Sequence, residues 1–264
     1  MSVRTDVKRV LARAATSRPA EGATLLIYHR VGGGTQDELD LPVVSFERQL
    51  EALDSYRVVH LDDALDALDR GDAGPRVVLT FDDGFGDVYA NAWPRLRERG
   101  LPFTLYVATR YVGGTMHWEG STARGSGAPA LTWRQLEEMA GSGLCTIGNH
   151  TDSHVRPELL TAVELDTCTR VLRERLNVTP RHFAYPWGVA VPELEEALRA
   201  RFRSAATGRL GRNRPGADLM RLCRVPVRGS DPIGFFRAKL DGGLLPERLY
   251  GGITATAKRV GVRA

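Results

Sequence analysis

Residues 77–84 read VVLTFDDG, an apolar run that ends in two adjacent acids and a glycine. The β-branched and aromatic side chains of residues 77–81 predict a buried strand, and Gly84 permits a tight turn after it. Adjacent carboxylates at the end of a strand suit a metal site, although an aspartate that caps a turn is the simpler structural alternative. We therefore expect Asp82 and Asp83 at the carboxyl end of a strand.

The same pattern recurs along the chain, because short apolar runs alternate with helix-like stretches over its whole length. This alternation predicts a largely parallel sheet with crossover helices, and about seven such units favour a closed or nearly closed barrel. We expect one of the helices at residues 45–56, with Ser45 as its cap. The predicted strands are residues 24–28, 77–81, 103–107, 146–148, 182–185, 204–207 and 224–227.

The composition is that of a globular chain, with 264 residues, 42% hydrophobic and 26% charged. No run approaches the roughly 20 apolar residues that cross a bilayer. The basic N-terminal stretch lacks the apolar core of a secretory signal, so we expect a cytoplasmic protein with no integral membrane segment. The three cysteines form no C-x-x-C cluster, so neither a disulfide framework nor a thiolate zinc site is predicted.

The net charge of +4 is concentrated at the two ends of the chain. Residues 1–22 and the last seven residues are both strongly basic, which leaves the body between them mildly acidic. Such ends are usually solvated, and a nucleic-acid partner is not expected. We therefore predict a basic tail at residues 1–22, a single barrel domain at residues 23–250 and a second basic tail at residues 251–264.

Three further strings follow predicted strands, where a barrel gathers its functional side chains. Residues 149–154 read NHTDSH, and two histidines four residues apart on one face of a helical turn can reach one divalent ion. Residues 183–188 read FAYPWG, which is either core packing before a turn or a rigid loop that aims a backbone N–H at a substrate oxygen. Residues 28–31 read YHRV and place His29 at the end of the first strand.

Together, TFDDG, HTDSH and FAYPWG resemble the motifs of the polysaccharide deacetylases, which are carbohydrate esterase family four and are also called the NodB-homology domain. The resemblance spans residues 24–231, and YHRV ahead of TFDDG is similar to the branch that includes the poly-N-acetylglucosamine deacetylases. It implies a distorted (β/α)7 barrel. It also implies metal-dependent removal of acetyl groups from N-acetylated sugars or glycans, which releases acetate and a free amine.

The resemblance also implies roles for individual residues, and zinc is the metal that an N2O ligand set suits best, with cobalt or nickel as alternatives. The implied metal ligands are Asp83, His150 and His154. The implied general base is Asp82, the general acid is His29, and the oxyanion donor is the backbone N–H of Tyr185. The candidate substrate contacts are Pro186, Trp187, Trp118 and Arg224.

Two departures from the family pattern concern arginine and histidine. Ala184 stands where the family has an arginine that orients the catalytic aspartate, and either Arg224 or Arg181 could replace it. The late Leu-x-His motif is also missing, because Arg224 stands at the histidine position. These departures keep open an inactive carbohydrate-binding barrel, or a hydrolase of an O-acetyl ester or non-sugar amide.

Two Gly-rich segments are expected to be long surface loops, at residues 113–130 and 208–218. The first is the better candidate for a lid over the substrate. Its Trp118 is either a stacking surface for a sugar ring or a buried anchor for the loop.

Overall fold

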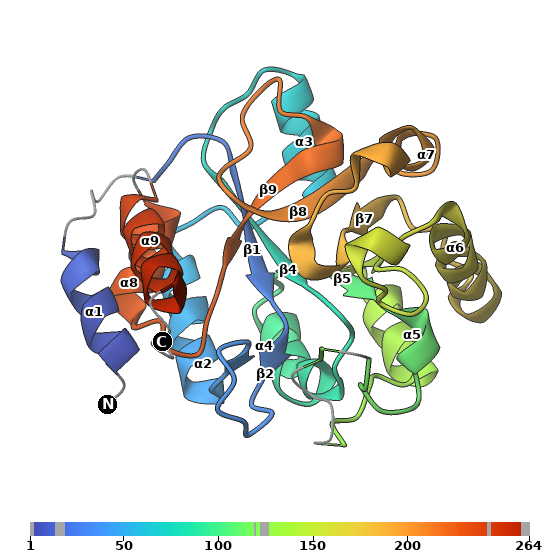
Figure 1. Cartoon of the computed structure of the whole chain (residues 1–264), viewed down its shortest axis with the longest axis horizontal. Coiled ribbons are helices and arrows are strands. Elements are labelled where there is room, and N and C mark those ends of the chain that lie inside the picture. The colour runs from blue at the N-terminus through green and yellow to red at the C-terminus, as the bar shows by residue number, and fades with distance from the viewer. Residues whose placement is uncertain (1–2, 14–18, 119, 122–126, 242–243, 260–264) are drawn as a thin grey trace.

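Seven parallel strands close into a barrel in which β9 returns to pair with β1 (Figure 1). The computed structural model describes residues 3–13, 19–118, 120–121, 127–241 and 244–259. All seven predicted strands are present, and the single-domain (β/α)7 barrel is confirmed. In barrel order the strands are β1 (Ala23–Tyr28), β4 (Arg76–Phe81), β5 (Phe103–Val107), β6 (Cys145–Asn149), β7 (His182–Ala184), β8 (Ser204–Leu210) and β9 (Leu222–Pro226).

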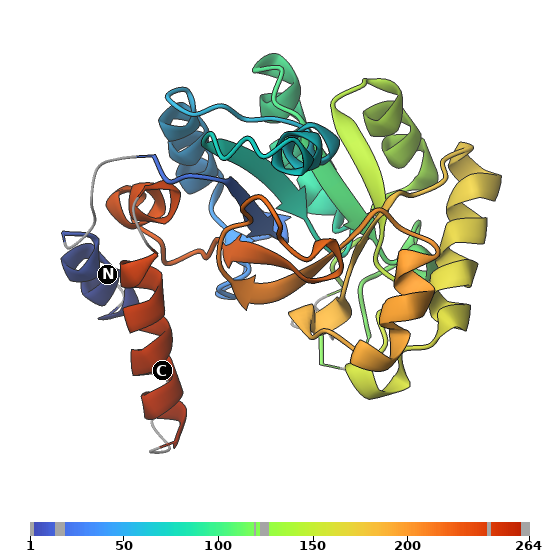
Figure 2. The same cartoon turned by 90° about the horizontal axis from the view of Figure 1, so that it is seen from above.

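Helices surround the barrel, as expected for crossovers between parallel strands (Figures 1 and 2). The predicted cap at Ser45 is wrong, since the helix begins two residues earlier, after Pro42. Proline has a φ close to that of a helix, and its carbonyl accepts from the Ser45 N–H at 2.9 Å. The helices are α2 (Val43–Leu53), α3 (Leu61–Asp69), α4 (Trp93–Glu98), α5 (Trp133–Gly141), α6 (Ala162–Leu176), α7 (Glu195–Arg199) and α8 (Ile233–Leu240).

Two short strands after β1 were not predicted. β2 (Arg30–Val31) and β3 (Asp40–Leu41) form a separate parallel pair outside the barrel. The predicted loop at residues 208–218 is shorter than expected, because β8 continues to Leu210, which pairs with Arg224 beyond an irregularity in the register. β2 and β3 were missed because two residues are too few to show the alternation of a strand. The end of β8 was missed because Gly208 is typical of a turn.

The barrel interior is filled mainly by small and aliphatic side chains. One buried cluster joins residues of the strands, including Val78, Tyr106, Ala184 and Ala206, to the inner face of α3. A larger cluster lies between the strands and helices such as α2 and α5. The interior is therefore packed rather than open, and a site can form only at the ends of the strands.

The two ends of the chain differ from the expected solvated tails. α1 (Val3–Ala12) contacts α8 and α9 (Leu245–Arg259) at one side of the barrel (Figure 2). The buried Lys8 side chain reaches Asp231, so part of the N-terminal basicity is neutralised inside the fold. α9 also runs through the expected domain boundary at residue 250, while residues 14–18 and 260–264 lie outside the described residues.

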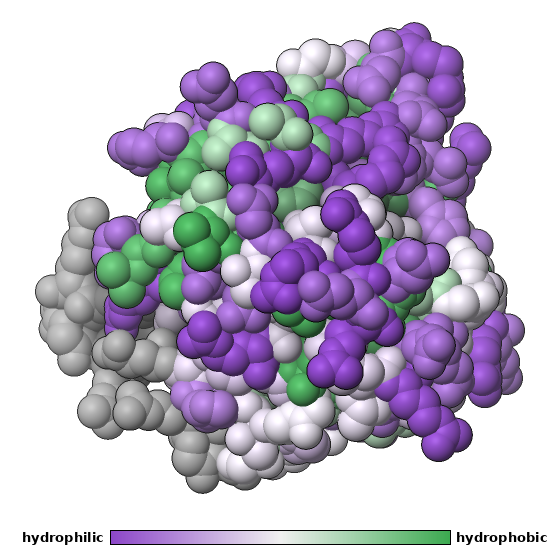
Figure 3. Space-filling view, turned by 90° about the vertical axis from the view of Figure 1, so that its right-hand side faces the viewer, coloured by the Kyte–Doolittle hydropathy of each residue, from purple (hydrophilic) through white to green (hydrophobic). Residues whose placement is uncertain are grey.

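The outer surface is mainly hydrophilic on the side where α6 and α7 lie, and hydrophobic side chains interrupt it in places (Figure 3). Within the described ranges, none of the helices combines the length and the apolar character that crossing a membrane requires.

Candidate metal centre and catalytic site

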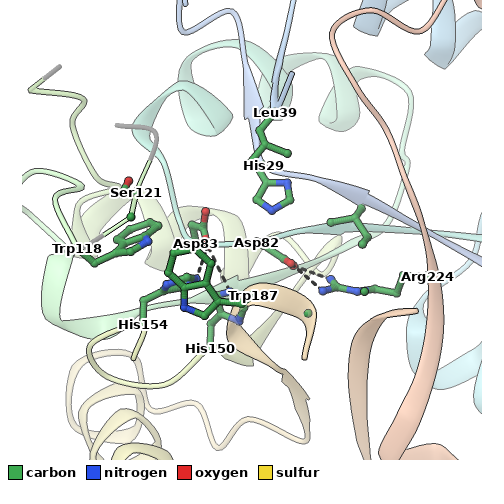
Figure 4. A pocket seen from close by; sticks show the side chains of 14 residues that line it. His29, Leu39, Asp82, Asp83, Trp118, Ser121, His150, His154, Trp187 and Arg224 are labelled. Carbon is green, nitrogen blue, oxygen red and sulfur yellow. Dashed lines mark hydrogen bonds and ion pairs between the residues drawn. The ribbon is translucent and has the colours of Figure 1, made fainter. Parts of the chain in front are cut away.

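A pocket of about 280 Å³ opens at the carboxyl ends of the barrel strands. It is lined by residues from all four sequence strings, which approach it from different strands (Figure 4). The predicted site residues in its lining are His29, Asp82, Asp83, Trp118, His150, His154, Trp187 and Arg224. The barrel therefore brings together most of the side chains that the sequence singled out.

Asp82 and Asp83 diverge although they are adjacent in sequence. Asp83 has a left-handed backbone, with φ of 76°, and Gly84 follows with φ of 97°. This tight turn directs the Asp83 carboxylate toward the two histidines, and its Oδ1 lies 3.2 Å from His150 Nε2 and 3.3 Å from His154 Nε2. Asp82 instead points toward Arg224 (Figure 4).

The histidine pair lies in a loop, so the predicted helical turn is wrong. Thr151 and His154 have left-handed φ values of 68° and 52°, which no α-helix contains. Side chains stabilise the loop, because the Thr151 N–H donates to Asn149 Oδ1 and the His154 N–H donates to Thr151 Oγ1, both at 2.9 Å. Asn and Thr at these positions are the sequence signal for such local bonds. The two rings still converge, with centroids 5.0 Å apart.

The geometry of Asp83, His150 and His154 fits a divalent metal ion. Their candidate ligand atoms all lie within 4.8 Å of one another, and all three residues are buried. His150 Nδ1 donates to the Ala184 carbonyl at 2.8 Å, which leaves the Nε2 lone pair for a ligand bond. Two ligand atoms on a tetrahedral zinc ion lie about 3.3 Å apart. The separations of Asp83 Oδ1 from the two Nε2 atoms match that value.

The electrostatics of the cluster keep the carboxylate charged. Burial by itself raises the pKa of Asp83, but the adjacent imidazoles of His150 and His154 outweigh it and hold that pKa well below its usual value. Burial lowers the pKa of His154, with a partial offset from Asp83. Burial also lowers the pKa of His150, but the carboxylates of Asp83 and Asp82 outweigh burial and raise it. An ionised carboxylate and a neutral imidazole are the forms that bind a metal, so metal binding at His150 would displace a proton.

Arg224 replaces the arginine that the family pattern has at the position of Ala184. From β9, its guanidinium donates to both oxygens of Asp82, at 2.7 and 2.8 Å. Two further N–H groups donate to the Thr207 carbonyl and to Thr80 Oγ1. Four of its five donors are thus used inside the protein, so the geometry makes Arg224 the partner of Asp82. Arg224 also lines the pocket, and its contact with substrate stays a prediction.

The second candidate, Arg181, lies elsewhere and pairs with Asp62 at 2.9 Å. Arg224 also explains the charge of Asp82. Burial raises the pKa of Asp82, but the positive charge of Arg224 outweighs burial and lowers the pKa below its usual value.

His29 reaches the pocket from the end of β1 and lies across from the histidine pair (Figure 4). A positive charge on His29 would lower the pKa of both Asp82 and Asp83, so the ring lies within electrostatic reach of the two carboxylates. Among the described residues, nothing forms a hydrogen bond with its buried Nδ1. The structure thus places His29 in the pocket, and its role as the acid stays a prediction.

The predicted oxyanion donor is wrong. The Tyr185 N–H donates to the Ala206 carbonyl at 2.9 Å, which extends the pairing of β7 with β8 by one residue. Pro186 has no N–H, and the Gly188 N–H donates to the Tyr185 carbonyl at 3.0 Å. Trp187 lies between them in a left-handed conformation, with φ of 63°. Across the described chain, no backbone carbonyl accepts from its N–H.

The two tryptophans of the pocket differ in exposure. Trp118 is 8% exposed, and its ring lies 4.3 Å from the His154 ring, with Tyr111 and Phe85 also in contact. This packing favours the buried anchor over the sugar platform. Trp187 is 41% exposed at the mouth of the pocket. Of the expected lid at 113–130, residues 119 and 122–126 lie outside the described residues.

Comparisons with known proteins agree with this geometry. Residues 69–201, half of the chain, match the family model for polysaccharide deacetylases. The chain is also 29% identical over 150 residues to the putative polysaccharide deacetylase YxkH of Bacillus subtilis. That alignment covers 55% of this chain and 48% of the relative, so the chain spans about half the length of the curated relative it matches.

Solved structures show the same fold. IcaB from Ammonifex degensii is 33% identical, with a TM-score of 0.72 over 85% of this chain and 100% of that one. The Streptococcus pyogenes deacetylase PplD, solved in complex with acetate, is 22% identical, with a TM-score of 0.70 over 85% of this chain and 100% of that one. The likeness to PplD concerns the fold alone. The likeness to IcaB extends to the sequence as well as to the fold.

Proposed function

The chain belongs to the polysaccharide deacetylase family, and we propose that it is a metal-dependent N-deacetylase of N-acetylated sugars or glycans that releases acetate and a free amine. One observation carries the proposal. The pocket holds a three-residue ligand set around Asp83 and, separately, the carboxylate of Asp82 fixed by Arg224. Metal binding and proton acceptance need different carboxylates, and this pocket supplies both.

Asp83, His150 and His154 would hold the metal, for which we propose Zn²⁺, with Co²⁺ or Ni²⁺ as alternatives. When bound, such an ion polarises an amide carbonyl and makes a water molecule more acidic. Contacts inside the protein hold two of these ligands in place. The Ala184 carbonyl fixes the tautomer and the orientation of the His150 ring, and the Trp118 ring packs against His154.

Asp82 would accept the proton of the attacking water. Arg224 binds both of its oxygens, but each carboxylate oxygen has a second lone pair that remains for a proton. The bidentate pair also prevents rotation of the carboxylate, so the proton acceptor stays aimed at the same point.

His29 would donate a proton to the leaving amine. An amide breaks only when its nitrogen leaves in protonated form, and histidine is the side chain best suited to exchange a proton near neutral pH. His29 lines the pocket, and this position supports the role. It also supports our placement of the chain in the poly-N-acetylglucosamine deacetylase branch, in which the YH motif supplies the acid.

For the oxyanion, we propose the backbone N–H of Trp187 in place of that of Tyr185. Tyr185 and Gly188 already donate to carbonyls, and Pro186 has no donor. Trp187 lines the pocket beside His154, with ring centroids 5.5 Å apart. A backbone donor aimed at the developing negative charge contributes about 3–4 kcal/mol to the transition state.

The reading of the chain as an inactive sugar-binding barrel loses its main support. It rested on the missing arginine at Ala184, whose function Arg224 takes over from another strand. The other reason was the missing late histidine, and the position of His29 in the pocket supports our proposal that His29 replaces it.

Acetate release tests the function directly. The panel is N-acetylglucosamine oligomers, acetylated xylan and small acetamides, each measured with added zinc and after exhaustive chelation. We expect zinc-dependent release from the N-acetylglucosamine oligomers. Release from acetylated xylan alone would make the protein an O-acetyl esterase, and release from the acetamides alone would make it a non-sugar amidase. Sugar binding with no release from any substrate would restore the inactive barrel.

Asp87→Asn is the control variant. Asp87 pairs with Arg30 outside the pocket, so this variant should keep the activity of the wild type.

A further inference from the structure

Tyr106 lies inside the barrel beneath the site, and neither the family motifs nor the sequence strings include it. We propose that Tyr106 is a positioning residue whose ring supports the Arg224 guanidinium and, through it, the carboxylate of Asp82. The inference rests on the proposed function in one respect, because that function makes Asp82 the proton acceptor.

The contacts of the Tyr106 ring reach both halves of the site. The side chain is fully buried in β5, and Arg224 Cζ lies 5.7 Å from its ring centroid. The ring of His150, one of the three candidate metal ligands, lies 6.4 Å away. One side chain therefore touches the cation that holds Asp82 and also a residue of the metal centre.

Neighbouring strands provide room for this ring. A Cβ at Gly148, the residue that pairs with Tyr106 on β6, would clash with the Tyr106 ring. Ala184 and Ala206 pack in the same interior cluster and are also small. Ala184 is the position at which the family pattern has its arginine. Here the cation enters from β9 instead, and Tyr106 on β5 occupies space near it inside the barrel.

A planar guanidinium uses its edge for hydrogen bonds, so only packing holds its faces. The edge of Arg224 is occupied by Asp82, Thr80 and the Thr207 carbonyl. An aromatic ring near the guanidinium restrains it and excludes water, and the lower local dielectric strengthens the ion pair with Asp82. Loss of the ring should therefore loosen the carboxylate.

The ring rather than the hydroxyl is responsible. Within the described structure, no hydrogen-bond partner exists for the buried Tyr106 hydroxyl. An unpartnered buried hydroxyl destabilises a fold, so its removal should not harm the site. Tyr106→Phe is thus the conservative variant that should rescue the function of the ring.

Thr104 provides a matched control. It lies two residues earlier on β5 and so faces the same side of the strand, and it is also buried. In the described ranges its hydroxyl, like that of Tyr106, lacks a partner. Thr104→Val removes a buried hydroxyl from the same face of β5. The Thr104 side chain is not among those that bind Arg224.

The experiment measures kcat, KM and bound metal for the intact protein. We expect Tyr106→Leu to lower kcat by about 10–100-fold with KM nearly unchanged, while Tyr106→Phe and Thr104→Val stay near the wild-type rate. In an Arg224→Met background, Tyr106→Leu should add almost nothing, because both changes act on the same element. Unchanged kcat in Tyr106→Leu, full additivity with Arg224→Met, or failure of Tyr106→Phe to rescue would each overturn the proposal.

A crystal structure separates this inference from the proposed function. In Tyr106→Leu, or in the better-filling Tyr106→Met if the first variant does not fold, Arg224 should lose its two-bond geometry with Asp82. An intact bidentate pair in the variant would contradict the positioning role, whatever the activity. A wild-type protein that releases no acetate would contradict the proposed function, and the structure of the variant would still decide the role of Tyr106.

Discussion

Two clusters of buried charge lie in different parts of this molecule, and in the described part of the chain only one of them gathers candidate metal ligands. The first is the pair of Asp82 with Arg224, beside Asp83. The second joins α1 to α8, where Asp231 binds Lys8 at 2.7 Å and Lys239 at 2.5 Å. All of these residues are buried. Burial and opposite charge are therefore common to a site and to a structural contact.

The clusters differ in what their polar atoms face. Around Asp231, donors meet acceptors, because two ammonium groups and the N–H of Arg228 converge on one carboxylate. Around Asp83, three potential electron-pair donors converge instead, two imidazole nitrogens and one carboxylate oxygen. Such an arrangement is unfavourable unless a proton or a cation lies between them. Convergent ligand atoms thus distinguish the candidate metal centre from the structural cluster.

The largest effect is expected when the ligand carboxylate of the first cluster is removed. Asp83→Ala removes one of three ligands, so we expect loss of bound metal and of turnover, as measured by metal analysis and acetate release. Asp231→Ala is the matched control, and it should retain metal. Full activity after exhaustive chelation would contradict the assignment of a metal site.

Asp82→Asn should separate proton transfer from metal binding. We expect the rate to fall by about 10²–10⁴-fold, because a neutral amide cannot accept the proton. The bound metal should remain, since Asp82 points to Arg224 and not to the histidines. A variant that purified without metal, or that kept a near-normal rate, would show that the two aspartates are misassigned.

His29→Ala should affect the leaving group alone. Amide turnover should fall by about 10²–10³-fold, while activated esters, whose leaving groups need no proton, are spared. His182→Ala is the control, because His182 is at the start of β7, away from the pocket, and contacts Ser204 at 2.9 Å. Normal amide hydrolysis by His29→Ala, with loss in His182→Ala, would reverse the assignment.

Asp231→Asn should change stability and leave catalysis intact. Breaking a buried ion pair on one side costs about 3–5 kcal/mol in the free energy of unfolding, which denaturant titration measures. The rate per folded molecule should not change. Asp6→Asn, which alters an exposed pair with Arg9, should have almost no effect on either quantity. A loss of kcat in the folded Asp231→Asn protein would mean that the two clusters are coupled.

The smallest effect is a pH dependence of the second cluster. Burial raises the pKa of Asp231, but the charges of Lys239 and Lys8 outweigh it and lower the pKa below its usual value. A lowered pKa contributes stability above the unfolded value of about 3.9, and that stability is lost as the pH falls further. The difference in unfolding free energy between wild type and Asp231→Asn should therefore shrink below about pH 4. A constant difference down to low pH would contradict the role of Asp231.

The amino-acid sequence by itself determined the seven strands of the barrel and the identity of the residues around the pocket. Strand–helix alternation is a local property, so each strand could be read from a short stretch. The two adjacent acids and the histidine pair could be expected near one another because barrels gather polar residues at the carboxyl ends of their strands, whereas the choice of Asp83 as the ligand came from the family resemblance. The burial of Lys8 could not be read from the sequence, since composition does not show that Lys8 meets Asp231.

Only the tertiary structure decided how the chosen residues are used. Arg224 and Asp82 are 142 residues apart in sequence, and the closure of β9 onto β1 brings them together. The same is true of the Tyr185 N–H, whose partner Ala206 is on the neighbouring strand β8. The physical reason is that a motif specifies side-chain chemistry locally, whereas a hydrogen-bond partner or a buried cation is selected by which strands become neighbours when the barrel closes.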